Sequence, residues 1–248
     1  MHEPQLASVG GARWSSEELW PTSNRRARVL FVLFWVWYAA SGIVFLRTGG
    51  FDSIWPLSLS LVWWLVLLFR AELQAWGRAV PLPIWLKFLI VGLFFSDVVM
   101  GNLAVSFKGD LHPNLALSSF LWLGAYAGVV MAWWLLAHLY PFTPWQVFFI
   151  YGFKGVIIEQ DFMLPTMLWK GDWFSALVAA PFLVVVYGSA VAPMFVILQK
   201  ELPKPGRRVG WIAVGLSIVV TMAGFYAGAF VWFRLVEVLF GLKIPGAG

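Results

Sequence analysis

The sequence predicts an all-α protein, a polytopic helical transmembrane bundle in which seven membrane-spanning helices are joined by short loops. Hydrophobic residues make up 61% of the 248 residues and charged residues only 12%, whereas soluble globular domains contain about 45–50% apolar and about 25% charged residues. A transmembrane helix needs about 20 mostly apolar residues to cross about 30 Å of hydrocarbon. The chain offers seven such stretches, without the alternating pattern of a membrane β-barrel.

The seven stretches follow one another with little sequence between them. Backbone polar groups in lipid must be satisfied internally, so continuous apolar runs of this length indicate helices. The second stretch is the shortest and begins near Trp55 and Pro56, so it starts earlier or crosses with little tilt. The expected spans are 29–46, 54–69, 84–107, 115–139, 145–164, 174–198 and 209–233.

The connections between these spans are rich in turn-forming residues. Glycine, proline and asparagine cluster at 48–50, 81–83, 112–114, 141–144 and 203–206, where they break helices and favour turns. Because all these connections are short, residues 29–248 are expected to form one transmembrane domain.

The first 28 residues are polar and are expected to form a cytoplasmic segment. Residues 15–18 resemble a helix-capping box and lie beside Trp14, Leu19 and Trp20, which predicts a short interfacial helix. A cleavable signal peptide is not expected, because the first apolar run is too long and begins too late.

The distribution of lysine and arginine predicts the orientation. Basic residues are expected in excess on the cytoplasmic side of a membrane protein. One side of the predicted bundle holds Arg13, Arg25, Arg26, Arg28, Arg70, Arg78, Lys87, Lys200, Lys204, Arg207 and Arg208, and the other holds Arg47, Lys108, Lys170, Arg234 and Lys243. We therefore expect a cytoplasmic N-terminus and an extracytoplasmic C-terminus, in the cell (inner) membrane.

Composition also excludes several classes of protein. The small number of charges argues against a disordered chain and against a nucleic-acid binder, so the net charge of +5 is interpreted as a topology signal. The absence of cysteine excludes disulfides, thiolate catalysis, Fe–S clusters and cysteine-ligated zinc. His2, His112 and His138 lack the spacing of metal ligands, so neither a metal nor another cofactor is expected.

Ionisable residues inside the spans are the candidate catalytic residues, because charges in lipid are costly. At 1.5 Å per residue, Lys154 lies about 14 Å and Glu159 about 21 Å into the fifth span, and Asp97 about 18 Å into the third. Two carboxylates and an ammonium group at comparable depth predict an acid–base site in the outer half of the bundle. Lys154 is expected to contact a polar group of another helix, with Asp97 the leading candidate.

Asn102, Gln160 and Asp161 lie near this predicted site and are the candidate substrate-binding residues. A purely structural alternative has Gln160 and Asp161 capping the helix at the outer interface while Lys154 extends to the membrane surface. A second alternative is a Lys–Asp pair that only fixes the register of two helices.

Small residues repeat on two of the predicted helices, at Gly124 and Gly128 and at Gly224 and Gly228. Such positions let helices approach closely in lipid, so they predict helix packing. The same glycine-rich faces could hold an oligomer or a larger membrane complex.

The prolines inside the spans have two possible roles, and so do the tryptophans. Pro181 and Pro193 either kink the sixth span or free backbone carbonyl groups toward a cavity. The deep tryptophan pairs at 63–64 and 133–134 either pack in the core and against lipid or line a slot for a flat apolar ligand.

Three functions remain open on the sequence. The first is a membrane-embedded enzyme that acts on a lipid or isoprenoid through carboxylate acid–base chemistry. The second is a small transporter or proton-coupled carrier, and the third is a non-catalytic subunit of a larger membrane complex. The expected partners are the lipid bilayer and a lipophilic small molecule.

Overall fold

The computed structural model describes the backbone of residues 25–48, 54–104 and 114–241. Within these ranges it describes all side chains except those of residues 48, 54–59, 100–104, 115 and 159–163. The described part is helical apart from its connections and contains no strand. Its elements are α2 (Arg25–Thr48), α3 (Ile54–Leu68), α4 (Arg70–Ala79), α5 (Ile84–Leu93), the π-helix η2 (Phe94–Ala104), α6 (Leu115–Leu139), α7 (Pro144–Trp169), α8 (Trp173–Ile197) and α9 (Trp211–Phe240).

Helices occur where the seven spans are predicted, but α7 and α9 extend beyond the expected ends, to Trp169 and Phe240, and the division into elements differs at two places. The third span is divided into α5 and η2, and the short helix α4 follows α3. The N-terminal residues 1–24, with the predicted interfacial helix, lie outside the described residues, and α2 already begins at Arg25.

Four of the described helices are long and apolar enough to cross a membrane, namely Arg25–Arg47, Ala116–Leu139, Trp173–Ile197 and Trp211–Phe240. In α7 the apolar stretch Pro144–Ile158 is shorter, and α3 contains only 15 residues. The four long helices fit an integral membrane protein. The count of seven spans remains a prediction.

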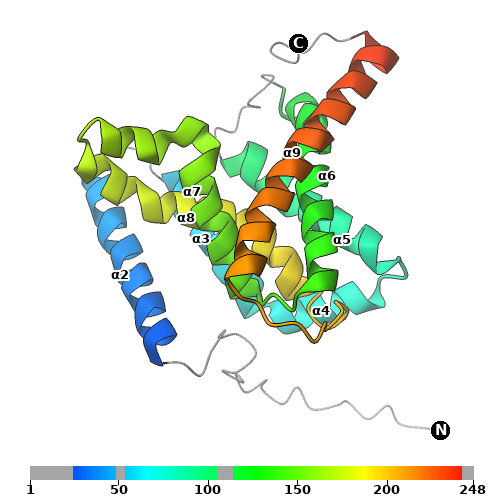
Figure 1. Cartoon of the computed structure of the whole chain (residues 1–248), viewed down its shortest axis with the longest axis horizontal. Coiled ribbons are helices and arrows are strands. Elements are labelled where there is room, and N and C mark those ends of the chain that lie inside the picture. Colours follow the sequence, from blue (N-terminus) through cyan, green and yellow to red (C-terminus); the bar gives the residue numbers. More distant parts are fainter. Residues whose placement is uncertain (1–24, 49–53, 105–113, 242–248) are drawn as a thin grey trace, which may run out of the picture.

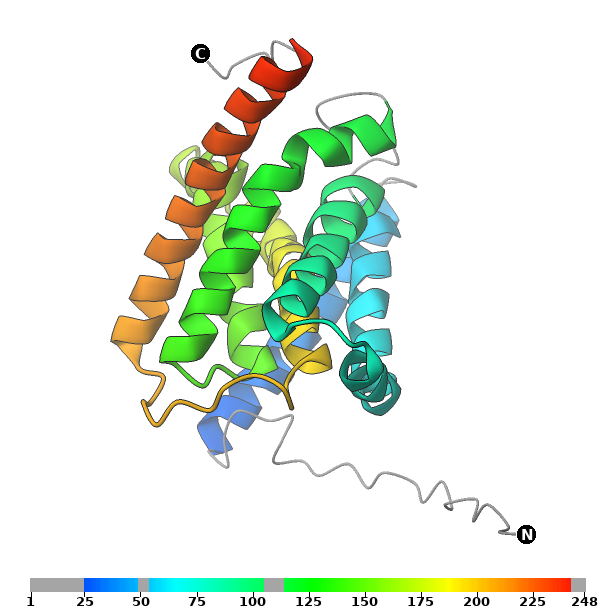
Figure 2. The same ribbon diagram turned by 90° about the vertical axis from the view of Figure 1, so that its right-hand side faces the viewer.

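Helix α8 is the central element. Every residue from Ala180 to Ile197 is buried, as expected for a helix that is apolar on all sides. Helices α7, α3, α2 and η2 pack around it, and α5 and α4 contact it as well. Figures 1 and 2 show α8, in yellow, running through the middle of the bundle.

Helix α9 lies on the outside of the bundle and packs mainly along α6 (Figure 2). A Cβ atom on Gly128 would collide with the carbonyl oxygen of Gly224, and one on Gly228 with the carbonyl oxygen of Gly124. The packing role predicted for both glycine repeats is therefore confirmed, and it is fulfilled within one chain.

Glycines also bring α7 and α8 together. A Cβ atom on Gly152 would lie 2.5 Å from the carbonyl oxygen of Val184, and one on Gly188 would lie 2.7 Å from that of Phe148. Helix α7 begins with a complete capping box, in which Thr143 and Gln146 each accept a backbone N–H. This start and the close contact hold Lys154, two turns further along, against the core.

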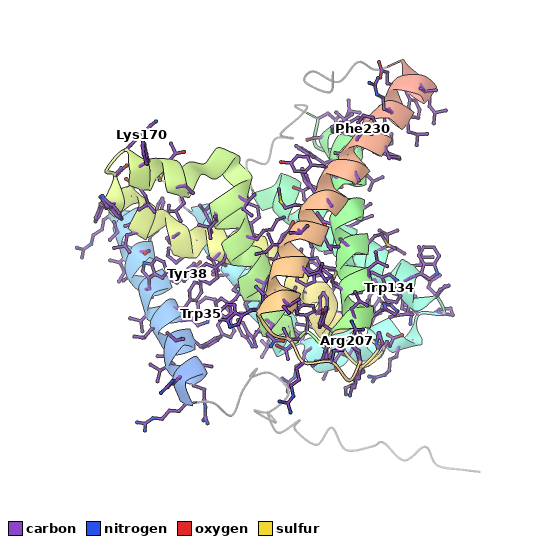
Figure 3. The ribbon with its side chains drawn as sticks, viewed as in Figure 1. Trp35, Tyr38, Trp134, Lys170, Arg207 and Phe230 are labelled. Carbon is purple, nitrogen blue, oxygen red and sulfur yellow. The ribbon has the colours of Figure 1, made fainter. Side chains whose placement is uncertain are left out.

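The two ends of the bundle differ in charge. One end, called here the basic end, carries the first turn of α2, helix α4 and the connection between α8 and α9, with Arg25, Arg26, Arg28, Arg78, Lys200, Lys204, Arg207 and Arg208. Figure 3 shows Arg207 at this end and Lys170 at the other. Most of the described basic residues thus lie on the side for which the sequence predicts the cytoplasm.

Candidate functional site

Lys154 is a buried cation inside the bundle. Its side chain is 2% exposed, and its Nζ atom lies 4.4 Å from the centre of the Tyr151 ring. A cation over an aromatic face is stabilised by about 2 kcal/mol when it is desolvated. Tyr151 also faces Trp133 of α6, with ring centres 6.4 Å apart. The alternative that Lys154 extends to the membrane surface is therefore wrong.

Asp97 is a buried carboxylate on η2. It is 3% exposed, and the neighbouring Ser96 is buried with its hydroxyl donating to the Gly92 carbonyl at 2.7 Å. The backbone here is a π-helix, a rare conformation that is frequent at functional sites. Gly92 fits between Val130 of α6 and Met194 of α8, which fixes the entry into η2.

The two buried charges lie on elements that share neighbours. Both η2 and α7 pack against α8. Both elements also contact α6. Element η2 packs on it directly, and α7 contacts it through the ring of Tyr151, which lies against Trp133. Asp97 and Lys154 are thus held around the same pair of helices, and a direct contact between them stays a prediction.

The remaining candidate residues lie where side chains are not described. The backbone of Asn102 belongs to η2 and that of Glu159, Gln160 and Asp161 to α7, but their side chains lie outside the described residues. The idea that Gln160 and Asp161 cap their helix is wrong, because α7 continues to Trp169 and its C-cap is Lys170.

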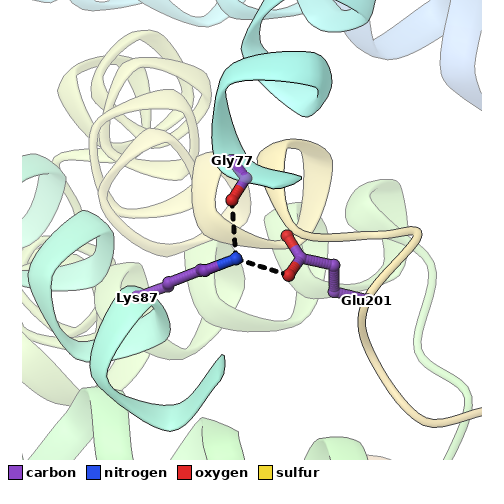
Figure 4. Close-up of polar contacts among 3 residues, drawn as sticks. All are labelled: Gly77, Lys87 and Glu201. Carbon is purple, nitrogen blue, oxygen red and sulfur yellow. Dashed lines mark hydrogen bonds and ion pairs between the residues drawn. The ribbon is translucent and has the colours of Figure 1, made fainter. Parts of the chain in front are cut away.

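A second polar cluster lies at the basic end. The Lys87 ammonium group donates to the Gly77 carbonyl and to Oε2 of Glu201, both at 2.7 Å (Figure 4). Lys87 thereby joins α5, the last turns of α4 and the connection after α8. Sequence reasoning counted Lys87 among the basic residues of the cytoplasmic side, at the start of the third span, and missed this pair. The available signal was Glu201, the single acidic residue in a strongly basic connection.

Helix α4 is fastened to the end of α8 by a further buried contact. The Gln74 amide donates to the Val196 carbonyl at 2.9 Å. Gln74 and Gly77 are the buried residues of α4, whereas Trp76 is exposed. The buried face docks on the protein, and the opposite face is free for the membrane interface.

Pro181 has a structural role that the sequence left open. Proline has no N–H, so the Leu177 carbonyl, four residues earlier, loses its helical donor. The Trp37 indole N–H donates to that carbonyl at 2.9 Å. Pro181 therefore links α8 to α2.

Tryptophans and phenylalanines of α2, α3 and α7 form one aromatic cluster. Trp63 lies 4.9 Å from Phe148 and 5.0 Å from Trp145, and Trp35 lies 5.1 Å from Trp64, between ring centres. Figure 3 shows Trp35 on the side of α2 that faces the bundle. The core interpretation of Trp63 is confirmed, since it is fully buried.

Several buried polar atoms in the described part of the chain lack a hydrogen-bond partner. They include the indole nitrogens of Trp35, Trp63 and Trp133 and the hydroxyl of Ser189.

The described residues contain no group of three or more metal-binding side chains. The His138 ring nitrogen Nδ1 lies 2.8 Å from the Trp134 carbonyl.

Comparison with protein-family models, curated proteins and solved structures gives no match to this chain. Its function is therefore inferred from its own residues.

Proposed function

We propose that the chain is a membrane-embedded enzyme that acts on a lipid or isoprenoid through proton transfer. We further propose seven spans in the cell membrane, with the N-terminus in the cytoplasm. Asp97 and Glu159 would exchange protons with the substrate, Lys154 would stabilise negative charge, and Asn102, Gln160 and Asp161 would bind its polar groups. The observation that carries the proposal is the burial of both Asp97 and Lys154 in the bundle interior.

The cost of this burial is the main support. An ionised side chain at the centre of a membrane costs about 3 kcal/mol on insertion scales. Replacing a buried ion pair by apolar residues is often neutral or stabilising, so a pair that only fixes register is not needed for stability. Two charged groups on elements around α6 and α8 are therefore better explained by chemistry.

The surroundings suit an apolar substrate. A carboxyl group in a water-poor site can accept or donate a proton, and a nearby ammonium group stabilises developing negative charge. The rings of Tyr151 and Trp133 beside Lys154 add apolar surface against which such a substrate can pack.

The test follows proton transfer directly. Purified protein is incubated in deuterated buffer with a lipid extract of its own membrane, and mass spectrometry measures deuterium bound to carbon. We expect labelling of one lipid class that falls about 10²-fold or more in Asp97→Asn. Asp172→Asn is the matched control, because Asp172 is exposed and asparagine preserves its helix cap. No labelling by the wild type, or equal labelling by Asp97→Asn, would refute the enzyme.

A carrier is the second candidate, and Ser189 favours it. The Ser189 hydroxyl is buried without a partner, and Pro193 deprives the Ser189 carbonyl of its helical donor. Polar backbone atoms inside a central helix are typical of transporters. Proton flux into liposomes that disappears in Asp97→Asn, without deuterium in any lipid, would favour the carrier.

Topology is tested separately. A reporter fused after Gly248 should be active only in its extracytoplasmic form. Activity of a cytoplasmic reporter at that position would contradict the seven-span count.

A further inference from the structure

The connection between α8 and α9 carries a dense group of cations. Its exposed basic residues are Lys200, Lys204, Arg207 and Arg208. None of their side chains takes part in an ion pair or a hydrogen bond within the described part of the chain. The single acidic residue of the connection, Glu201, already binds Lys87. The fold itself therefore pairs none of these four charges.

The connection is also held in a fixed shape. Leu198 at its start is fully buried, and Leu202 and Val209 pack against the hydrophobic core. Pro203 and Pro205 restrict the backbone between these two contacts. Because the apolar side chains fasten the connection to the bundle, its cations are presented outward, and binding a partner there orders little additional backbone.

The position of the connection indicates which partner it meets. It joins α8 and α9, two helices that are each long and apolar enough to cross a membrane, so it lies at a membrane surface. Trp211, the first residue of α9, is 89% exposed, and tryptophan is enriched at the level of lipid headgroups. The four cations therefore lie beside headgroups, which are present there at higher concentration than any soluble anion.

We propose that this connection binds the headgroups of anionic phospholipids. The guanidinium groups of Arg207 and Arg208 bind phosphate through paired hydrogen bonds, and Lys200 and Lys204 add positive charge. A zwitterionic headgroup carries a cationic group that cancels the charge of its phosphate, so the connection selects headgroups with a net negative charge. The surface is separate from the buried charges of the bundle and does not depend on the proposed chemistry.

The test identifies the lipids beside the connection. The chain contains no cysteine, and a Cβ atom on Gly206 would meet no neighbouring atom within 4 Å. Gly206→Cys therefore offers a single attachment point for a photoreactive probe. The labelled chain is placed in nanodiscs of equal phosphatidylglycerol and phosphatidylcholine, and mass spectrometry measures the crosslinked lipids. We expect about fivefold or more phosphatidylglycerol, which is the effect of one basic residue near an anionic surface, and a smaller excess at high salt.

Substitutions test the cations themselves. With the same probe, Lys200→Gln/Lys204→Gln/Arg207→Gln/Arg208→Gln should crosslink both lipids equally, and Arg207→Gln/Arg208→Gln alone should reduce the excess. Arg47 and Lys170 are exposed at the other end of the bundle, and the control Arg47→Gln/Lys170→Gln should keep the excess.

Three outcomes would overturn the proposal. The first is equal crosslinking of both lipids by the chain that retains its four cations. The second is an excess of phosphatidylglycerol that is unchanged when all four are replaced. The third is a probe that crosslinks mainly to residues 1–24, because the glutamates of that segment would then be the partner of the connection.

Discussion

The ion pair between Lys87 and Glu201 gives the sharpest stability prediction. Replacing Lys87 with methionine keeps most of the side chain's length and removes two hydrogen bonds, to the Gly77 carbonyl and to Glu201. The change also leaves the Glu201 carboxylate without its cation. Lys87 binds Oε2, and the buried Oε1 has no hydrogen-bond partner that could compensate. We therefore expect Lys87→Met to destabilise the end of the bundle that carries α4.

The magnitude follows from the burial of the two partners. Hydrogen bonds to charged groups contribute about 1.5–3 kcal/mol each. The side chain of Lys87 is 8% exposed and that of Glu201 is 21% exposed, so water compensates part of the loss at Glu201 and the lower value applies. We expect a loss of about 3 kcal/mol, at the lower limit for breaking a buried pair. The double variant Lys87→Met/Glu201→Leu should lose less than the sum of the single changes, because it leaves no buried charge alone.

The assay is denaturation of the purified protein in mild detergent, with limited proteolysis of the connection after α8 as a local measure. Lys200→Met is the matched control, because Lys200 is exposed in the same connection. A loss for Lys87→Met no larger than for Lys200→Met would refute the reasoning. Strictly additive single and double variants would show that the two side chains do not stabilise each other.

The remaining predictions concern helix packing and the buried charges. Gly128→Val should cost more than about 3 kcal/mol or prevent folding, whereas Gly215→Val, at an open position of α9, should cost less than about 1 kcal/mol in the same detergent melt. Trp37→Phe removes the donor to the freed carbonyl of Leu177 in α8 and should cost about 0.5–1.5 kcal/mol, because this hydrogen bond is exposed; an unchanged melt would contradict that hydrogen bond. Lys154→Met and Asp97→Asn should couple by at least about 0.5 kcal/mol in a double-mutant cycle, and additivity would separate the two residues.

The positions of the long helices could largely be read from the sequence, because long apolar runs indicate them. The expected 115–139 agrees with α6, since Asn114 caps its start and the turn at Pro141 follows its end. The end of α7 was misplaced at residue 164, directly before Pro165. Pro165 lies inside the helix, which continues to Trp169. In a membrane, neighbouring helices compensate for a proline that would end a helix in water.

Side-chain partners could not be read in this way, because they depend on how the helices are arranged. Depth along a helix correctly placed Lys154 and Asp97 in the interior, but it could not show which helix each one faces. The donor for the carbonyl freed by Pro181 is Trp37, about 140 residues earlier in the chain. The pairing of Lys87 with Glu201 depends on α4, a polar helix too short for a search based on apolar spans to find.

The packing of α9 on α6 has a consequence for synthesis of the chain. About 70 residues, including α7 and α8, separate the end of α6 from the start of α9. At ~5–20 residues per second, a ribosome needs on the order of ten seconds to make them. During this time the face of α6 around Gly124 and Gly128 is not yet covered, because α9, the helix that packs on it, has not been synthesised. A newly made chain that stops before α9 therefore presents a ready docking surface, which a chaperone of the membrane or a second nascent chain can occupy until the last helix arrives.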